Sequence, residues 1–450
     1  MNKYEQYKPS GVEWLGEVPE HWGICRLKNT CTIYNGATPS SANPDYWDGE
    51  IIWVTPKDIN NQKFIATSER KITEEGFQNC GTNIVPKGSV ILTTRAPIGK
   101  VAVAEQELCT NQGCKSLVIN EKIKSHFLYY LLASSNERLN TLGTGTTFME
   151  IGAAALGSIK IALPPIEEQT TIAAYLDERT AYIDRLIAKQ QALSEKLSEK
   201  RTALITEAVC GRVKISPSPS LQKRGTSLSE NNAQSSKHHE TAPLFSKEGL
   251  GEICFKDSGI QWFGKVPAHW LIPSISKLFL IKAGGDLKPE FFSKEKDAEH
   301  PHPIYTNANS KTAVYGYSSQ VFYPANSITV SGRGEVGYAV YRDHAFDAII
   351  RLLVLTPKKE LDCRYYAYLI NSVIDFTVES TAVGQLSAVQ LAPYKVLLPP
   401  LTEQVAIADY LDTETAKIDR LQAKIGESVE RLKEYRAALI TQVVTGKVKV

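Results

Sequence analysis

The sequence contains no long apolar run, although it extends over 450 residues. A helix that crosses a bilayer needs about 20 consecutive apolar residues. The first residues, MNKYEQYKPSGVEW, also lack the apolar core of a secretion signal. The eight cysteines include no Cys-x-x-Cys pair, the spacing typical of zinc sites. We therefore expect a cytoplasmic protein without a metal site, whose cysteines are small buried residues in a reducing compartment.

Motifs of several common enzyme classes are missing as well. The Gly-Lys pairs at 99–100 and 446–447 are followed by Val rather than by the Ser or Thr of a phosphate-binding loop. The segment 332–337, GRGEVG, fits a dinucleotide-binding fingerprint, but the following YAVYRD is typical of a strand rather than of the required helix. The segment 43–46, NPDY, has Asp where DNA adenine methyltransferases carry a second proline. The sequence thus predicts no catalytic residues.

The chain instead contains a tandem duplication. SGVEWLGEVPEHW, from Ser10 to Trp22, returns as SGIQWFGKVPAHW, from Ser258 to Trp270, and we call these two copies the tryptophan motifs. Residues 163–215 align without a gap with residues 398–450, and more than half of the aligned positions are identical. Self-similarity of this extent indicates a repeated structural unit, and the chain is too long for a single hydrophobic core.

The duplication predicts the domain boundaries. Between the halves lies a segment rich in Ser, Pro and Asn with few large apolar residues, which favours a flexible linker. The two globular parts combine short β-branched and aromatic runs with turn residues, which predicts strand-rich domains. We expect a conserved N-terminal segment at 1–22, a globular domain at 23–162 (head 1), a conserved helix at 163–215, the linker at 216–254, the repeated segment at 255–270, a globular domain at 271–397 (head 2) and a C-terminal conserved helix at 398–450.

The two conserved helical segments have a heptad pattern. Glu167 and Glu168 favour a helix start, and Gly211 and Gly446 follow the last periodic residues and suit helix ends. An apolar seam with this spacing predicts that each helix packs on a partner helix, although each could instead cover its own domain. The predicted seam consists of Ile183, Leu186, Gln190, Leu193, Leu197, Lys200 and Leu204 in the first helix, and of Ile418, Leu421, Ile425, Ser428, Leu432, Tyr435 and Leu439 in the second.

The two heads have little sequence in common apart from one short pattern. SVILTTRAPIGK, at 89–100, aligns with SITVSGRGEVGY, at 327–338, so that Arg95 matches Arg333 and Gly99 matches Gly337. Two divergent heads on two matching helices indicate a protein that contacts its target at two points with a fixed separation.

These motifs resemble those of the specificity subunit of type I restriction–modification systems. The resemblance rests on the tryptophan motifs, GATPSSANPDYW, IIWVTPKDI, TTRAPIGK and the pair LPPIEEQ and LPPLTEQ, each followed by Ile-Asp-Arg-Leu. It implies a mixed α/β (α+β) fold in which two strand-rich target recognition domains are joined by two long helices that form an antiparallel coiled coil, a pseudo-twofold tandem repeat. Each head would read one half of a bipartite site in double-stranded DNA, and the helices would set the spacer.

The resemblance also implies the partners of the chain. Two methyltransferase subunits would dock on the helices and heads, and motor-endonuclease subunits would join them. The chain itself would be non-catalytic and would hold no cofactor, because S-adenosylmethionine, ATP and magnesium would belong to the partner subunits. No contact with a membrane is expected either, because the sequence has no apolar run of the length that spans a bilayer. The net charge of only +2 fits this division, since partner subunits would make most of the phosphate contacts.

Candidate DNA-contacting residues are polar loop residues near the predicted strand ends. Arg or Lys pairs well with guanine, and Asn with adenine. The candidates are Thr55, Lys57, Asp58, Arg95 and Lys100 in head 1, and Asn307, Asn309, Lys311 and Arg333 in head 2. Two other functions stay open: an assembly scaffold whose heads bind protein, and a self-contained DNA methyltransferase or nuclease with unrecognised motifs.

Overall fold

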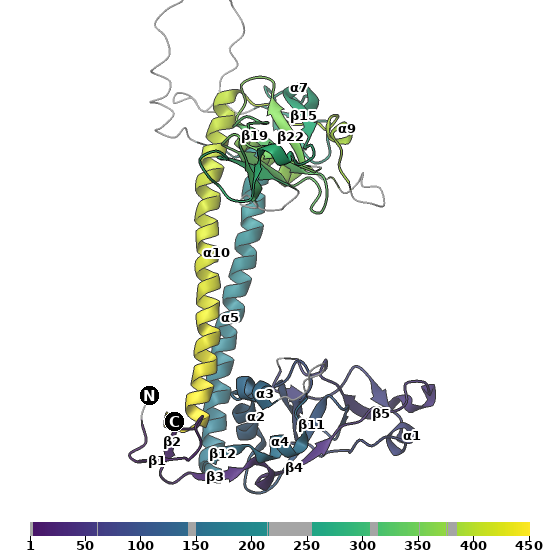
Figure 1. The fold of residues 1–450 in the computed structure, drawn as a ribbon, viewed down its shortest axis with the longest axis vertical. Coiled ribbons are helices and arrows are strands. Elements are labelled where there is room, and N and C mark those ends of the chain that lie inside the picture. The colour runs from purple at the N-terminus through teal and green to yellow at the C-terminus, as the bar shows by residue number, and fades with distance from the viewer. Residues whose placement is uncertain are drawn as a thin grey trace, which may run out of the picture. The chain divides into compact units, whose positions relative to one another are not determined.

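The chain forms two compact units, each of which combines one head with parts of both long helices. Unit 1 contains residues 1–191 and 426–450, and unit 2 contains residues 192–425. The long helices are α5 (Ile166–Val209) and α10 (Leu401–Val444) (Figure 1). The computed structural model describes residues 3–60, 62–142, 150–213, 215, 254–306, 314–350, 352–374, 376 and 385–450. The predicted linker lies outside these residues except for Cys254.

Head 1 is built on a five-stranded sheet in the order β4-β11-β8-β9-β6. Its central strands β8 and β9 are apolar and fully buried, because hydrophobic clusters cover both faces of the sheet. The strands are β4 (Cys31–Asn35), β6 (Phe64–Ile65), β8 (Val90–Thr93), β9 (Val101–Ala104) and β11 (Cys114–Ile119). A second sheet contains β5 (Trp47–Val54), β7 (Lys71–Ile72) and β10 (Cys109–Thr110), and β3 (Gly23–Arg26) pairs with β12 (Lys160–Leu163). The helices are α1 (Glu74–Gln78), α2 (Ser125–Ala133), α3 (Asn136–Leu142) and α4 (Ala153–Ser158).

Head 2 contains two four-stranded sheets in the orders β15-β22-β19-β20 and β16-β18-β17-β21. The first sheet consists of β15 (Phe279–Ala283), β22 (Leu352–Pro357), β19 (Ser327–Ser331) and β20 (Ala339–Arg342). The second consists of β16 (Phe292–Ser293), β18 (Val314–Ser318), β17 (His302–Tyr305) and β21 (Asp347–Ala348). The helices are α7 (Ile275–Leu278), α8 (Cys363–Val373) and α9 (Ala388–Leu391). The remaining strands of the chain form two-stranded pairs, β1 (Tyr7–Pro9) with β2 (Glu17–Pro19) and β13 (Phe255–Asp257) with β14 (Lys265–Pro267).

The two heads share one core topology although their sequences have diverged. The order β4-β11-β8-β9 in head 1 corresponds to β15-β22-β19-β20 in head 2, and all these neighbours are antiparallel. Helix α2 packs on β9 in the same way that α8 packs on β20. The prediction of two strand-rich domains on long helices is confirmed, and the structure adds a common core sheet. The sheets differ at one edge, where β6 follows β9 but, among the described residues, no strand follows β20.

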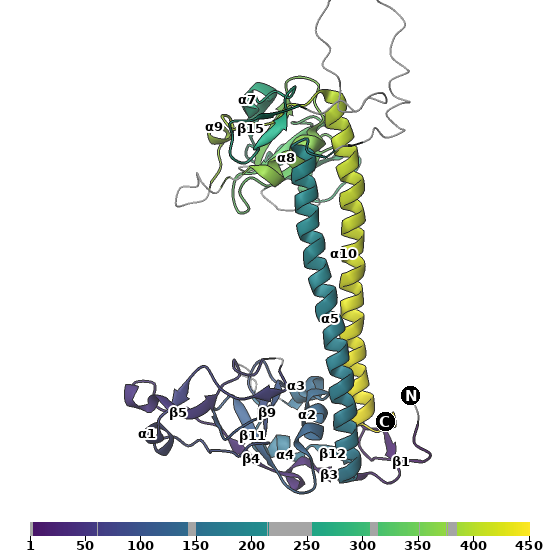
Figure 2. The same cartoon turned by 180° about the vertical axis from the view of Figure 1, so that it is seen from behind.

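The two long helices pair in antiparallel orientation within unit 1 (Figures 1 and 2). Arg436 Nε lies 2.9 Å from Asp184 Oδ1. Gln190 Nε2 donates to Ser428 Oγ at 3.0 Å. A position further along α5 thus meets a position earlier in α10, as antiparallel packing requires.

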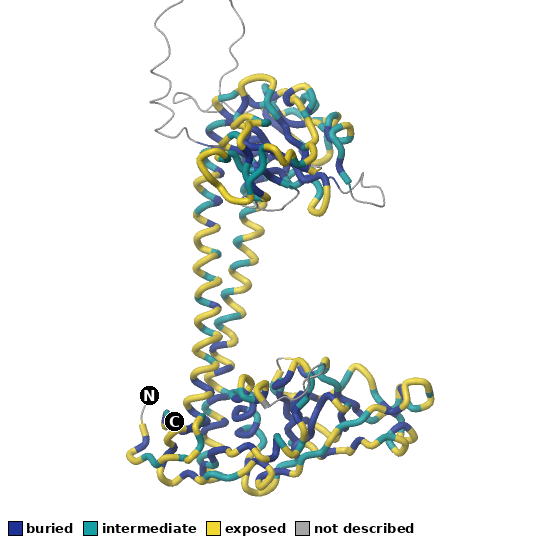
Figure 3. Tube along the Cα trace, in the orientation of Figure 1, coloured by how far each residue is buried: buried dark blue, intermediate teal, exposed yellow. Residues whose placement is uncertain are grey.

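The same pairing is repeated within unit 2. Arg201 Nε donates to Asp419 Oδ1 at 3.1 Å, and Gln422 Nε2 donates to the carbonyl oxygen of Ser194 at 3.2 Å. In the sequence alignment of the two helices, this Arg–Asp ion pair is the reciprocal copy of the ion pair in unit 1. Elsewhere much of the surface of both helices is exposed, whereas buried residues are concentrated in the heads (Figure 3).

The predicted heptad seam consists of two interleaved sets of positions, and the prediction is correct for the set that contains Ile183 and Ile418. Ile183 and Ile418 are buried. In the other set the prediction is wrong at Leu193, Leu421 and Tyr435, which are about half exposed at 50%, 50% and 51%. Ser428, which belongs to this set, does contact the partner helix. The residues that follow the three exposed positions in sequence contact the partner helix instead, namely Ser194, Gln422 and Arg436. A prediction based on apolar residues therefore misplaces this contact between the two helices, because polar side chains form it through hydrogen bonds and an ion pair.

The first tryptophan motif connects the start of α5 to the end of α10 within unit 1. His21 Nε2 lies 2.8 Å from Glu168 Oε2 in the first turn of α5. Lys447, just after the end of α10, donates from Nζ to the carbonyl oxygen of Leu15 at 2.9 Å. The indole of Trp22 is fully buried beside Gly446.

The second tryptophan motif makes the reciprocal connection within unit 2. His269 Nε2 and Trp270 Nε1 lie 2.9 and 2.8 Å from the Glu403 carboxylate in the first turn of α10. Arg212, just after the end of α5, donates from Nη2 to the carbonyl oxygen of Phe263 at 2.6 Å. Each copy of the motif therefore binds the end of the long helix that belongs to the other half of the sequence. This is a physical reason for the motif to be present twice.

We expect Gly446→Ala to destabilise unit 1 and Gly426→Ala to stabilise it. Gly446 has φ 74°, and an added Cβ would lie 2.4 Å from Pro19 Cδ. The left-handed backbone alone costs a non-glycine residue about 1–2 kcal/mol. Gly426 is the matched control, because it lies inside α10 with nothing within 4 Å of an added Cβ, and Ala is favoured over Gly in a helix by about 1 kcal/mol. Thermal unfolding measures both, and equal shifts would contradict the assignment of Gly446 as a required helix end.

Candidate nucleic-acid interface

Both heads present a hairpin loop with the same backbone geometry, between β8 and β9 in head 1 and between β19 and β20 in head 2. The Gly99 amide donates to the carbonyl oxygen of Thr93 at 3.0 Å, and the Gly337 amide donates to that of Ser331 at 2.8 Å. The two glycines have φ 94° and 86°, values that favour glycine. The predicted match between the two loops is thus confirmed. The GRGEVG segment connects the strands β19 and β20. A dinucleotide-binding fingerprint would be followed by a helix, so the structure agrees with the prediction that this segment is not such a site.

The Arg95 side chain in the head 1 loop is held by a carboxylate. Its Nε and Nη2 atoms both lie 2.8 Å from Glu150 Oε2, and Lys115 Nζ lies 3.2 Å from Glu150 Oε1. Lys115 is almost fully buried, whereas Arg95 keeps 42% of its side chain exposed. Burial alone would raise the pKa of Glu150, but hydrogen bonds from Arg95 and Lys115 outweigh it and hold the pKa below its usual value. Glu150 is therefore an anion shared by two cations.

The Arg333 side chain in the head 2 loop has a neutral partner. Its Nη2 donates to Gln385 Oε1 at 3.2 Å, and the side chain is exposed. The strand position that Lys115 occupies in head 1 is taken here by Leu353, which is buried. At the described positions that correspond to Lys115 and Glu150, head 2 therefore has neither a cation nor a carboxylate. The Arg333 guanidinium contacts no carboxylate among the described residues and presents its full charge at the loop surface.

The predicted residues after β5 form a turn with internal hydrogen bonds. The backbone amide and the hydroxyl of Thr55 donate to Asp58 Oδ2 at 2.7 and 2.6 Å. Asp58 Oδ1 accepts from the Glu69 amide at 2.7 Å. Both side chains therefore shape the turn, while Lys57 between them is exposed. Of these three candidates, Lys57 has the side chain most available to a ligand.

The β10–β11 turn brings the head 1 candidates to one edge of the domain. The Thr94 amide, beside Arg95, donates to the carbonyl oxygen of Gly113 at 2.8 Å. An added Cβ on Gly113 would lie 2.8 Å from Pro56 Cγ, which places the turn containing Lys57 against the same residue. Lys100 closes the same hairpin loop, where its amide donates to Thr93 Oγ1 at 3.0 Å. The structure thus gathers the two loops that carry the predicted residues.

Sequence reasoning missed Glu150 and Gln385, the partners of the two loop arginines. A signal for them was present, because extending the gapless alignment of the helical repeats upstream places these two residues opposite each other. The backbone confirms the match, since the Ile151 amide donates to the carbonyl oxygen of Thr94 at 3.1 Å and the Leu386 amide donates to that of Gly332 at 2.9 Å.

The other predicted residues of head 2, Asn307, Asn309 and Lys311, lie outside the described residues. Within the described part of the chain, no group of three or more His, Cys, Asp or Glu side chains is placed to hold a metal ion. Over the same part, no helix combines the length and the apolar character that a membrane span requires.

Comparison with known protein families identifies the class of this protein. The family model of the type I restriction modification DNA specificity domain matches residues 19–196 and 274–431. These two matches cover most of both heads and both long helices, so the chain belongs to this family.

Individual relatives match shorter stretches. The type I restriction enzyme MjaIX specificity subunit of Methanocaldococcus jannaschii is 38% identical over 191 residues, which cover 41% of this chain and 43% of that protein. The type I restriction enzyme EcoR124I/EcoR124II specificity subunit of Escherichia coli is 30% identical over 181 residues, which cover 38% of this chain and 42% of that protein. Each alignment thus spans less than half of the curated relative.

Solved structures share the fold over nearly the whole chain. A chain from a structural study of complex assembly and conformational transition of the type I R-M system superimposes with a TM-score of 0.71 at 17% identity, covering 96% of this chain and 99% of that one. The HsdS subunit from Thermoanaerobacter tengcongensis superimposes with a TM-score of 0.53 at 17% identity, covering 96% and 98%. The tandem arrangement of two heads on long helices is therefore the fold of known specificity subunits.

Proposed function

We propose that this chain is the sequence-recognition subunit of a type I restriction–modification complex and that each head reads one half of a bipartite site in double-stranded DNA. The observation that carries the proposal is the duplicated hairpin loop. Both heads place an arginine at the same position of a loop with the same backbone geometry, on domains that otherwise differ in sequence. Arginine at a groove-facing loop is the side chain best suited to guanine. Family membership supports the same conclusion.

We further propose that the chain is cytoplasmic, does not bind a membrane and is non-catalytic by itself. Two methyltransferase subunits dock on the helices and heads, and motor-endonuclease subunits complete the assembly. S-adenosylmethionine, ATP and magnesium are bound by those partners. Exposed apolar side chains on the long helices support a docking role, because such side chains are enriched at protein interfaces. They are Tyr182 and Tyr435 in unit 1 and Leu193 and Leu421 in unit 2.

The proposal is tested by mapping methylated bases in DNA from cells that carry this chain together with its methyltransferase partner. The expected result is one motif with two specific halves separated by an unspecified spacer of constant length. Methylation by the purified chain alone would favour the self-contained methyltransferase. Loss of sequence preference after changes to the helices, but never after changes to the heads, would favour the assembly scaffold.

Arg95→Ala and Arg333→Ala are each expected to weaken recognition of one half-site by about 1–3 kcal/mol, if each arginine makes a bidentate contact with guanine. The measurement is binding of the assembled complex to site variants at fixed salt.

Gln385→Glu is the matched test of charge, because it gives Arg333 the carboxylate partner that Arg95 already has. We expect it to weaken DNA binding in head 2. Unchanged affinity and salt dependence in all three variants would reassign the arginines to a structural role.

A further inference from the structure

Head 1 contains a short strand that covers the edge of its core sheet. Strand β6 pairs in parallel with β9, with Phe64 opposite Val103. The Val103 amide donates to the carbonyl oxygen of Lys63 at 2.8 Å, and the Glu105 amide donates to that of Ile65 at 2.9 Å. The outward-facing amide of Val103 in β9 and the amide of Glu105 just after β9 are thus satisfied by an extended segment whose sequence is Lys-Phe-Ile.

The side chains of this segment enter a site formed by α2 and α5. Lys63 Nζ forms an ion pair with Asp177 and lies 4.8 Å from the ring centroid of Tyr130. The Tyr130 hydroxyl donates to the same Asp177 carboxylate at 2.6 Å. The Phe64 ring packs edge-on against His126, with 5.4 Å between ring centroids. A cation and an aromatic ring therefore hold the covering strand in place.

The equivalent edge of head 2 is open among the described residues. Strand β20 is the last strand of its sheet. The Ser331 amide donates to the carbonyl oxygen of Tyr338, so the alternation of antiparallel pairing turns the amides of Ala339 and Tyr341 away from β19. Ala339 is satisfied by the Asn371 side chain, through two hydrogen bonds of 2.7 Å. Tyr341, which corresponds to Val103, has no hydrogen-bond partner for its amide within the described part of unit 2.

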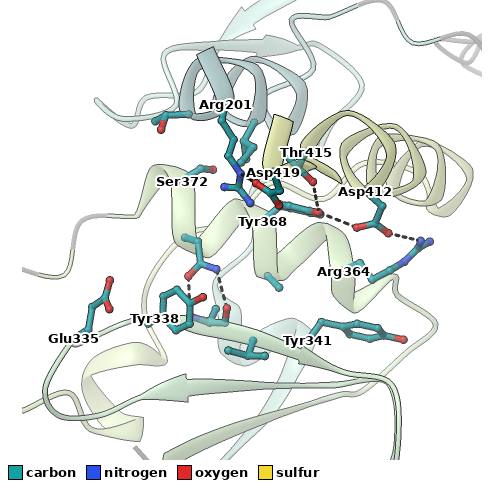
Figure 4. Close-up of a pocket in the computed structure, with 16 residues that line it drawn as sticks. Arg201, Glu335, Tyr338, Tyr341, Arg364, Tyr368, Ser372, Asp412, Thr415 and Asp419 are labelled. Atoms are coloured by element: carbon teal, nitrogen blue, oxygen red, sulfur yellow. Dashed lines mark hydrogen bonds and ion pairs between the residues drawn. The ribbon is translucent and has the colours of Figure 1, made fainter. Parts of the chain in front are cut away.

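A pocket of about 510 Å³ lies beside this edge, between β20, α8 and the helix segments of unit 2 (Figure 4). The Tyr368 hydroxyl donates to Asp412 Oδ1 at 2.8 Å, as Tyr130 does to Asp177 in head 1. The position of Tyr129 in head 1 is occupied by Ala367, which lines the pocket and leaves room there. The counterpart of the Lys63 site is therefore retained in head 2. There Arg364 of α8 contacts Asp412, and no strand pairs with the outer edge of β20 among the described residues.

The charge around this pocket favours a cation. Arg364 lies within 2.9 Å of three carboxylates, those of Asp362, Asp409 and Asp412. Arg201, Glu335 and Asp419 also line the pocket, so five carboxylates lie around two guanidinium groups. Asp412 keeps 45% of its side chain exposed. A Lys or Arg side chain placed beside Asp412 would offset part of this excess, as Lys63 does beside Asp177.

We propose that the open edge of β20 and the adjoining pocket bind an extended segment of a partner protein subunit, which adds to β20 in parallel and places a Lys or Arg beside Asp412 and an aromatic or aliphatic residue after it. Strand addition of this kind derives its affinity from main-chain hydrogen bonds and its selectivity from side-chain pockets. The proposal rests on the proposed function only in that it needs partner subunits. In this proposal a partner subunit supplies the strand that pairs with β20 of head 2, whereas in head 1 the chain itself supplies the equivalent strand, β6.

The first test uses a peptide with the sequence of residues 62–68, QKFIATS, as the probe. Added to the intact chain, it should bind once and should slow hydrogen exchange of the Tyr341 amide. A peptide with Glu in place of the Lys should bind about tenfold more weakly or less, because it loses a charge-assisted hydrogen bond and meets like charge. Equal binding of the two peptides, or binding without protection of Tyr341, would overturn the proposal.

The second test separates the contribution of the Tyr341 backbone amide to peptide binding from that of the Tyr341 side chain. Tyr341→Pro removes the outward amide and leaves the pairing with β19 intact, since proline is tolerated where the N–H points away from the sheet. Tyr341→Phe keeps the amide and is the matched control. We expect peptide binding to be lost in the first variant and kept in the second, and a circular dichroism spectrum like that of the unsubstituted chain shows that the first variant is folded. Loss in both variants or in neither would count against strand addition.

The third test uses the assembled complex. Hydrogen exchange at Tyr341 should be fast in the isolated chain and slow after assembly with the methyltransferase subunits. Slow exchange already in the isolated chain would mean that a segment of this chain covers the edge, which would overturn the assignment to a partner. Fast exchange in a complex that still recognises its DNA site would refute the docking proposal and leave the proposed function standing.

Discussion

Inserting four residues into both long helices is expected to lengthen the gap between the two DNA half-sites by one or two base pairs. Four residues add about 6 Å to a helix, and DNA rises about 3.4 Å per base pair. The insertions belong after Gln191 in α5 and after Gly426 in α10, where both residues are exposed. Both points lie between the Gln190–Ser428 and Ser194–Gln422 contacts, so a matched pair of insertions leaves every existing contact in register.

Two controls separate the rotational phase of the helices from the length of the linker. Two residues inserted at each of the same points rotate the following turns by about 200°, so we expect impaired assembly rather than a new spacer. Deleting ten residues within 216–250 should leave the spacer unchanged, because in the ruler model the length of the helices alone sets the distance between the heads. Mapping methylated sites for each variant provides the measurement. A spacer that follows the linker deletion and ignores the helix insertions would refute the model in which the helices act as a ruler.

Replacing head 1, residues 23–162, with the corresponding domain of a related specificity subunit is expected to change one half of the DNA target and to leave the other half intact. The fold supports such an exchange, because Gly23 pairs with Leu163 where β3 meets β12. The chain thus enters and leaves head 1 at adjacent points. In head 2, Leu271 and Leu398 form the equivalent bridge.

The donor domain must keep the contacts that attach head 1 to α5. These include Tyr130 with Asp177 at 2.6 Å, and the Lys124 amide with Gln169 Oε1 at 2.8 Å. The reciprocal exchange of residues 271–397 is the matched experiment and should change the other half of the motif. Methylome sequencing reads both results. A change in both halves after a single exchange would show that the heads do not act independently.

The sequence carried enough information to locate the helix ends and the matching hairpin loops. Gly211 and Gly446 end the long helices with φ 71° and 74°, because few residues other than glycine adopt that backbone conformation. Gly99 and Gly337 mark the loops for the same reason. Such features depend on residues close together in the chain, so a local pattern reveals them.

The partners of the candidate arginines were beyond the reach of local patterns. Arg95 and Glu150 lie far apart in sequence, and the ion pair between them depends on how the end of head 1 folds back onto the sheet. The same holds for Arg333 and Gln385. Whether an arginine is neutralised or free to bind an anion is therefore a property of the tertiary structure.

By itself the sequence determined the tandem duplication, the two strand-rich heads, the long paired helices and the likeness to specificity subunits, since repeats and heptads are periodic along the chain. Only the tertiary structure decided which residues form the seam, how each tryptophan motif fastens one half of the chain to the helix of the other, and which sheet edge is covered. Lys63 and Asp177 illustrate the reason. Their contact joins a loop strand to a distant helix, and the equivalent pocket in head 2 is recognised only when the two folded heads are compared.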